Sequence, residues 1–160
     1  MGIYFTPPEV VDYLVNRADR ALTTQFGLPD GLADASACPL SSNREEKKLV
    51  RILDPAMGTG AFLLSVLDRI RQRWLASERE QHSQTDAQSR WNVYVSSSLL
   101  PNVSGCEIVP ASYVIANVLF SMKLAESGFV PEPDDRLQLH LRDCLSRTEG
   151  ASYIVVIGNP

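Results

Sequence analysis

The chain has 160 residues, a length typical of one domain that buries a single core. Hydrophobic residues make up 44% and charged residues 21%, as in an ordinary globular protein, and no apolar run approaches the roughly 20 residues of a membrane span. The formal net charge is -4, with 10 basic and 11 acidic residues in positions 1–80 and 5 and 8 in positions 81–160. Neither half is basic. Either nucleic acid is not the partner, or the regions that bind it lie elsewhere in a longer chain.

The first element in chain order is a helix that follows residues Thr6-Pro7-Pro8-Glu9. Thr6 and Glu9 have the spacing of a capping box, proline suits the first turn of a helix, and Gly27 is a plausible end. Residues 1–27 are therefore predicted to form a helical segment, and the region 28–48, rich in Pro, Gly, Ser and Asp, is predicted to be a linker.

The remaining sequence, 49–160, alternates between strand and helix patterns. The predicted elements are strand 49–53, helix 61–75, strand 102–107, helix 110–125, strand 137–141 and strand 153–157. The last run is continuously apolar, which is typical of a buried central strand. Residues 77–92 are almost wholly polar and indicate a solvated helix end or a mobile loop. This order predicts an α/β fold with a mostly parallel sheet and right-handed crossovers.

The cysteines and histidines give little indication of a disulfide or a metal site. Cys38, Cys106 and Cys144 are odd in number and show no paired spacing, which favours reduced thiols in a cytoplasm. Only His82 and His140 could assist a metal. No metal site is predicted, and the aromatic residues Tyr4, Phe5, Trp74 and Trp91 are assigned by default to the core or to packing roles.

The strongest motif is the run from Asp54 to Phe62, DPAMGTGAF, between the first strand and its helix. Gly58 and Gly60 let the backbone approach a ligand closely at the carboxyl end of a strand, where open α/β sheets bind ligands. The run lacks the spacing of dinucleotide and phosphate loops, and its leading acid suits a cationic ligand better than a polyphosphate. The alternative is a tight turn with no ligand.

Three further polar residues follow predicted strands. Glu107 ends the second strand and could accept both hydroxyls of a ribose, or it could be a solvated carboxylate. It comes 53 residues after Asp54 (107 minus 54), and an inserted loop over 77–101 would account for that interval. Asp143 could bind an adenine amino group or cap a turn, and Asn159-Pro160 after the last strand is usually only a turn.

Together these residues resemble the amino-methyltransferases of DNA adenine. That family has a Y-x-T-P segment, a D-P-x-x-G-T-G-x-F loop, a strand-end acid, an Asp after the third strand and N-P-P-Y after the fourth. They match Tyr4 to Pro7, Asp54 to Phe62, Glu107, Asp143 and Asn159-Pro160.

Within that family, the segments 26–34, 99–101 and 155–160 are similar to the methylase module of large single-chain restriction-modification enzymes. The run Asp143-Cys144-Leu145 departs from the Asn-Thr-Leu-like segment of that subfamily and is closer to the general adenine pattern.

The resemblance implies a Rossmann-like class I methyltransferase fold, a single domain that is partial in this chain, and S-adenosylmethionine as cofactor. Asn159 and the Pro160 carbonyl would accept hydrogen bonds from the amino group of a flipped-out adenine. The cofactor-binding residues would be Tyr4, Thr6, Asp54, Pro55, Ala56, Gly58, Thr59, Gly60, Phe62, Glu107, Ile108, Asp143 and Cys144.

The N-P-P-Y tetrapeptide is incomplete here, which has several consequences for the expected function. The stacking Tyr is missing, so we expect this piece to be inactive and double-stranded DNA to be bound by regions outside it. Further strands of the family's sheet are also missing, and self-association through the exposed sheet edge is expected. The alternatives are a methyltransferase of protein glutamine or RNA, or a nucleotide-binding domain without catalysis. A cytoplasmic location in a bacterium or archaeon is expected.

Overall fold

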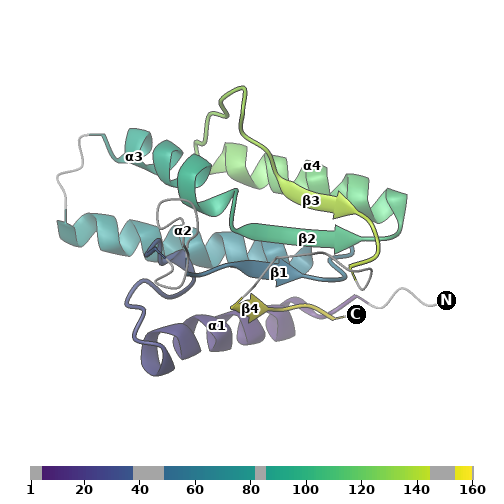
Figure 1. The fold of residues 1–160 in the computed structure, drawn as a ribbon, viewed down its shortest axis with the longest axis horizontal. Helices are drawn as coiled ribbons and strands as arrows, with labels where there is room; N and C mark the ends of the chain where they lie inside the picture. The colour runs from purple at the N-terminus through teal and green to yellow at the C-terminus, as the bar shows by residue number, and fades with distance from the viewer. Residues whose placement is uncertain (1–4, 38–48, 82–85, 145–153, 160) are drawn as a thin grey trace.

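Helices and strands alternate along the chain in the computed structural model, which describes residues 5–37, 49–81, 86–144 and 154–159. Figure 1 shows their arrangement. In chain order the elements are α1 (Pro8–Gln25), the 3-10 turn η1 (Gly31–Ala33), β1 (Ile52–Asp54), α2 (Ala61–Gln81), α3 (Ala87–Tyr94), the π-helix η2 (Val95–Leu99), β2 (Val103–Glu107), α4 (Pro110–Glu126), β3 (Gln138–Leu141) and β4 (Val155–Val156).

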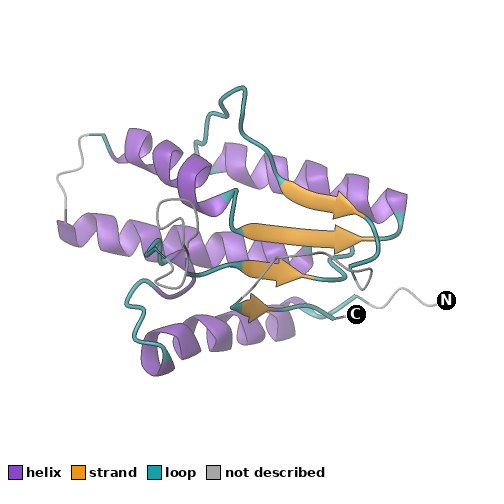
Figure 2. Cartoon of the chain, viewed as in Figure 1, coloured by secondary structure: helices purple, strands orange, loops and turns teal. Residues whose placement is uncertain are grey.

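The strands form one parallel sheet in the order β3-β2-β1-β4. Ile52 of β1 is in register with Val103 of β2 on one side and with Val155 of β4 on the other. Because the pairing is parallel, the carboxyl ends of the strands lie along one edge, at the right in Figure 2. The α/β fold predicted from the sequence is confirmed.

Helix α2 is the central helix of the layer that packs on this sheet. It contacts α1, η1 and α4. Its buried side chains recur at the three- and four-residue spacing of one helix face, and Leu63 of this face packs closely on Gly105 of β2. These side chains are Phe62, Leu63, Val66, Leu67 and Ile70.

Helix α1 begins differently from the capping box that the sequence predicts. Its N-cap is Pro7, and no side chain caps the helix. The carbonyl of Pro7 accepts the N–H groups of Val10 and Val11 at 3.0 and 3.1 Å. Two prolines in succession move the first turn one residue beyond the predicted cap, so Thr6 lies outside the helix. The predicted end is confirmed, because Gly27 has a φ of +67° after the helix.

The described part of the predicted linker, residues 28–37, is packed against the helices. Leu28 and Leu32 are buried, and the N–H of Leu32 donates to Oδ1 of Asp19 in α1 at 3.1 Å. Arg69 and Arg73 of α2 bind the same carboxylate through Oδ2, at 2.5 and 2.7 Å. Asp19 therefore holds α1, α2 and this segment together. Residues 38–48 lie outside the described part of the chain.

The polar stretch before β2 is largely helical, so the prediction of an inserted loop over 77–101 is wrong. Helix α2 continues to Gln81, and α3 and η2 follow. Trp91, Val95 and Leu99 are buried and four residues apart, so each turn buries one apolar side chain. The Trp91 ring lies 5.1 Å from that of Trp74, so both tryptophans have the packing role that the sequence predicts.

Strand β4 lies at one edge of the described sheet. Val155 is buried, but Val156 is 64% exposed, so the continuous burial predicted for the run 153–157 is wrong at this residue. Its side chain points to the opposite face from that of Val155, as successive residues of a strand do. Among the described helices, none has both the length and the apolar character needed to cross a membrane.

Candidate functional site

A cavity of about 290 Å³ opens at the carboxyl edge of the sheet. Four parts of the chain build it: the segment before α1, the glycine loop between β1 and α2, the start of α4 and the residues after β4. The residues that line it are Phe5, Thr6, Ala56, Met57, Gly58, Thr59, Ala61, Phe62, Val109, Ala111, Ser112, Ile115 and Asn159. The tertiary structure thus brings together three of the predicted motifs, from residues 6, 56–62 and 159.

The glycine loop has the backbone conformation that its sequence predicts. Gly58 and Gly60 have φ values of +57° and +93°, a region that strains any side-chain-bearing residue. The N–H of Gly60 donates to the Met57 carbonyl at 2.8 Å, and the N–H of Met57 donates to the Cys106 carbonyl of β2 at 2.9 Å. The loop is therefore a tight turn fixed to the neighbouring strand, with Gly58 on the cavity.

Glu107 binds the loop from the end of β2. Its Oε2 accepts the N–H of Gly58 at 2.8 Å, and its Oε1 accepts the N–H groups of Ile108 and Val109 at 2.8 and 2.7 Å. A carboxylate offers about four acceptor positions, so three are already used. The alternative of a solvated strand-end carboxylate does not hold, because Glu107 is buried and bound to three backbone donors.

Asp54 lies beneath the loop and is 1% exposed. Its Oδ1 accepts the N–H of Ala56 at 3.1 Å, while the buried Oδ2 has no hydrogen-bond partner among the described residues. Burial raises the pKa of Asp54 to about 7, the Ala56 N–H opposes that rise, and the charge of Glu107 adds to it. A buried carboxylate without a full set of partners is a feature of binding sites, although structural sites also produce it.

Asn159 is linked to the segment before α1. Its Nδ2 donates to Oγ1 of Thr6 at 3.1 Å, although 153 residues separate the two. Both side chains line the cavity. The residue before it, Gly158, packs on Asp54, since an added Cβ would lie 2.4 Å from Oδ1 of that carboxylate.

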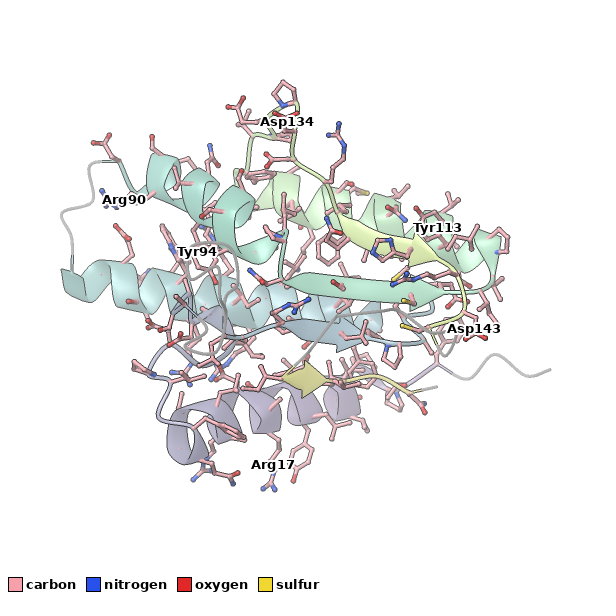
Figure 3. All side chains as sticks on the ribbon, in the orientation of Figure 1. Arg17, Arg90, Tyr94, Tyr113, Asp134 and Asp143 are labelled. Carbon is pink, nitrogen blue, oxygen red and sulfur yellow. The ribbon has the colours of Figure 1, made fainter. Side chains whose placement is uncertain are left out.

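The residues after β3, 142–144, do not line the cavity. Asp143 is exposed and stands at the carboxyl edge of the sheet in Figure 3. Burial, with the thiol of Cys106 beside it, raises the pKa of Cys144 to about 11. Ile108 is exposed next to Glu107, and the N–H of Arg142 donates to the Glu107 carbonyl at 2.9 Å.

Two predicted site residues, Tyr4 and Pro160, lie outside the described part of the chain. The assignment of Phe5 to the core is wrong, because Phe5 is 75% exposed and lines the cavity. The sequence also missed the apolar first turns of α4, although Ala111 and Ile115 have the four-residue spacing of one helix face. Within the described ranges, no group of three or more His, Cys, Asp or Glu residues could hold a metal ion.

No protein-family model matches the sequence, and no curated protein matches it significantly. The chain is similar in structure to a nuclease-deletion mutant of the Type ISP restriction-modification enzyme LlaGI in complex with a DNA substrate mimic. The identity is 26% and the TM-score 0.63, and the similarity covers 95% of this chain and 10% of that one.

The ATP-dependent Type ISP restriction-modification enzyme LlaBIII bound to DNA is similar at 25% identity and a TM-score of 0.63, over 96% of this chain and 9% of that one. DrdV, in a complex with DNA, shares the fold at 23% identity and a TM-score of 0.55, over 90% and 11%. The chain spans about a tenth of the length of these proteins. It is therefore related in structure to one part of restriction-modification enzymes.

Proposed function

We propose that this chain is the S-adenosylmethionine-binding part of a DNA methyltransferase that transfers a methyl group to the exocyclic N6 of adenine, within a restriction-modification enzyme. The observation that carries the proposal is the single cavity lined by Thr6, the glycine loop and Asn159. These motifs are far apart in the sequence and are the ones that such an enzyme needs side by side. LlaGI and LlaBIII, which are bound to DNA or a mimic of it, support DNA as the substrate.

The residues around the cavity fit the methionine half of this cofactor. The glycine loop contains no lysine that would favour a polyphosphate, and Asp54, directly before the loop, is an acidic residue. Phe5, Phe62 and Ile115 supply apolar walls. A volume of about 290 Å³ is near the lower end of ligand pockets, which start at about 300 Å³.

Glu107 sets a condition on the ribose half of the cofactor. With three of about four acceptor positions filled, its carboxylate has room for one further donor. Binding two ribose hydroxyls therefore requires the release of one of the three backbone N–H groups, and that of Gly58 is the one that comes from another part of the chain. We propose that the glycine loop moves away from Glu107 when the cofactor is captured.

The chemistry assigned to Asn159 follows from the nature of the target. S-adenosylmethionine, when bound, supplies a methyl group on a sulfonium. The amino nitrogen of adenine is a poor nucleophile because its lone pair is delocalised into the ring. The amide oxygen of Asn159 would accept a hydrogen bond from that amino group, which favours a pyramidal nitrogen and holds it toward the cavity.

Calorimetry with S-adenosylmethionine and S-adenosylhomocysteine tests the proposal on folded protein. We expect binding of both by the wild-type chain and an affinity loss of at least about tenfold, or about 1.4 kcal/mol, for Gly58→Val. The matched control is Gly27→Val. Both glycines have positive φ and open space around an added Cβ, but only Gly58 lines the cavity. The proposal is contradicted if neither ligand gives binding heat or measurable affinity on protein whose circular dichroism spectrum shows that it is folded.

A further inference from the structure

The hydroxyl of Thr6 has a partner that is far away in the sequence. Because Pro7 is the N-cap of α1 and no side chain caps the helix, Thr6 has no capping role. Its Oγ1 instead accepts the Nδ2–H of Asn159 at 3.1 Å. The contact joins the segment before α1 to the segment after β4, and both residues face the same cavity.

In this contact the Nδ2 end of the Asn159 amide faces Thr6 and the Oδ1 end remains available. An asparagine side chain carries a donor group and an acceptor oxygen of nearly equal shape, and the hydrogen-bond partners decide their orientation. With Nδ2 engaged by Thr6, Oδ1 is the end left over. Among the described residues, nothing donates to that oxygen.

The backbone that carries Asn159 is also held. The N–H of Ile157 donates to the Leu53 carbonyl of β1 at 2.9 Å. Gly158 then passes so close to Asp54 that an added Cβ would lie 2.4 Å from Oδ1. The segment therefore leaves the sheet on a path that β1 and Asp54 restrict as far as Gly158, the residue before Asn159.

We propose that Thr6 is a positioning residue for Asn159, whose Nδ2–H it accepts so that Oδ1 is offered to the cavity as an acceptor. The inference rests on the proposed function, because an amino group on the target requires an acceptor. The opposite orientation of the amide would place one NH₂ group against another. The Thr6 hydroxyl can accept or donate, so it holds the amide at the cavity, and the amino group of the target selects the orientation in which Oδ1 accepts.

The test uses ¹⁵N-labelled, ligand-free chain and follows the side-chain amide protons of Asn159 by NMR. Thr6→Val keeps the shape and removes the hydroxyl, so proton exchange of the Asn159 amide with water should become about fivefold faster, as expected for one lost hydrogen bond. Thr6→Ser should restore the wild-type rate. Thr24→Val is the matched control, because its hydroxyl donates within α1 to the Arg20 carbonyl.

Equal exchange rates in the wild type and in Thr6→Val would overturn the inference. If Thr6→Val does not fold, the wild-type chain decides: a nuclear Overhauser effect between the Asn159 amide protons and the Thr6 methyl supports the contact, and its absence overturns it. Calorimetry with S-adenosylhomocysteine on the same sample separates the two proposals. If the NMR data show the contact between Asn159 and Thr6 but the ligand does not bind, the proposed function alone is contradicted. If the ligand binds but the NMR data do not show the contact, the role of Thr6 alone is contradicted.

Discussion

The carboxylate of Glu107 accepts the backbone N–H of Gly58 at 2.8 Å and thereby connects the end of β2 to the loop that follows β1. We expect Glu107→Gln to lower the free energy of unfolding by about 1–3 kcal/mol, because the new NH₂ group faces buried N–H donors that then lack an acceptor. Urea denaturation measures this change. Glu132→Gln is the control, since that residue is exposed, and a decrease equal to that of Glu107→Gln would contradict the assigned contact.

The raised pKa of Asp54 predicts a pH dependence of stability. Burial moves the pKa from 3.8 to about 7 in the folded chain, so the folded state holds a proton that the unfolded state has released. This stabilisation is fully present below about pH 4 and is lost as the pH rises through 7, with a maximum of about 4 kcal/mol.

Asp54→Asn removes this titration. Its free energy of unfolding, relative to that of the wild type, should therefore rise between pH 4 and pH 8, which thermal unfolding at several pH values can measure. Asp134→Asn, at the exposed position labelled in Figure 3, should follow the wild-type curve. Parallel curves for wild type and Asp54→Asn would show that the carboxyl titrates normally.

The carboxylate of Asp19 is predicted to be a principal stabilising group of the helical layer. Burial acts to raise its pKa, but the bonds from Arg73, Leu32 and Arg69 outweigh it, and the pKa is lowered. Asp19→Asn should lower the free energy of unfolding by about 3 kcal/mol, because it leaves two arginines without their counter-charge. Chemical denaturation measures the loss.

The control for Asp19 is a surface ion pair between α2 and α4. Asp68 binds Lys123 at 2.8 Å but is half exposed, so Asp68→Asn should cost less than about 1 kcal/mol. Because the pKa of Asp19 is lowered in the folded chain, its contribution to the free energy of unfolding depends on pH. The contribution is present above pH 3.8 and is lost as the pH falls through the lowered pKa. Similar losses for both variants would contradict a special role for Asp19.

The edge position of β4 leads to a prediction about self-association. Val156 is 64% exposed on a strand that pairs on one side only within the described sheet. Edge strands of this kind associate unless a charge interrupts them. Light scattering should detect concentration-dependent association that Val156→Lys reduces and Val93→Lys, at an equally exposed position on α3, does not. A wild-type chain that stays monomeric at high concentration would refute this.

The sequence alone was sufficient for the local structure of the site. Glycines at 58 and 60 allow the positive φ values of the loop, and a β-branched and aliphatic run before them favours a strand. The order of strands and helices then leads to a parallel α/β sheet. These features depend on residues that are neighbours in the chain, which is why composition and spacing predict them.

Long-range packing decided the rest. The polar composition of residues 77–92 did not predict α3. One buried side chain per turn, of which Trp91 is the first, is enough to hold a short helix on a core. Phe5 lines a cavity instead of filling the core, since its neighbours there come from the glycine loop, α4 and the segment after β4. Thr6 resembles a cap in the sequence, yet it binds Asn159, 153 residues away. Only the folded chain brings such groups together, because a hydrogen bond between distant residues depends on where every intervening element packs.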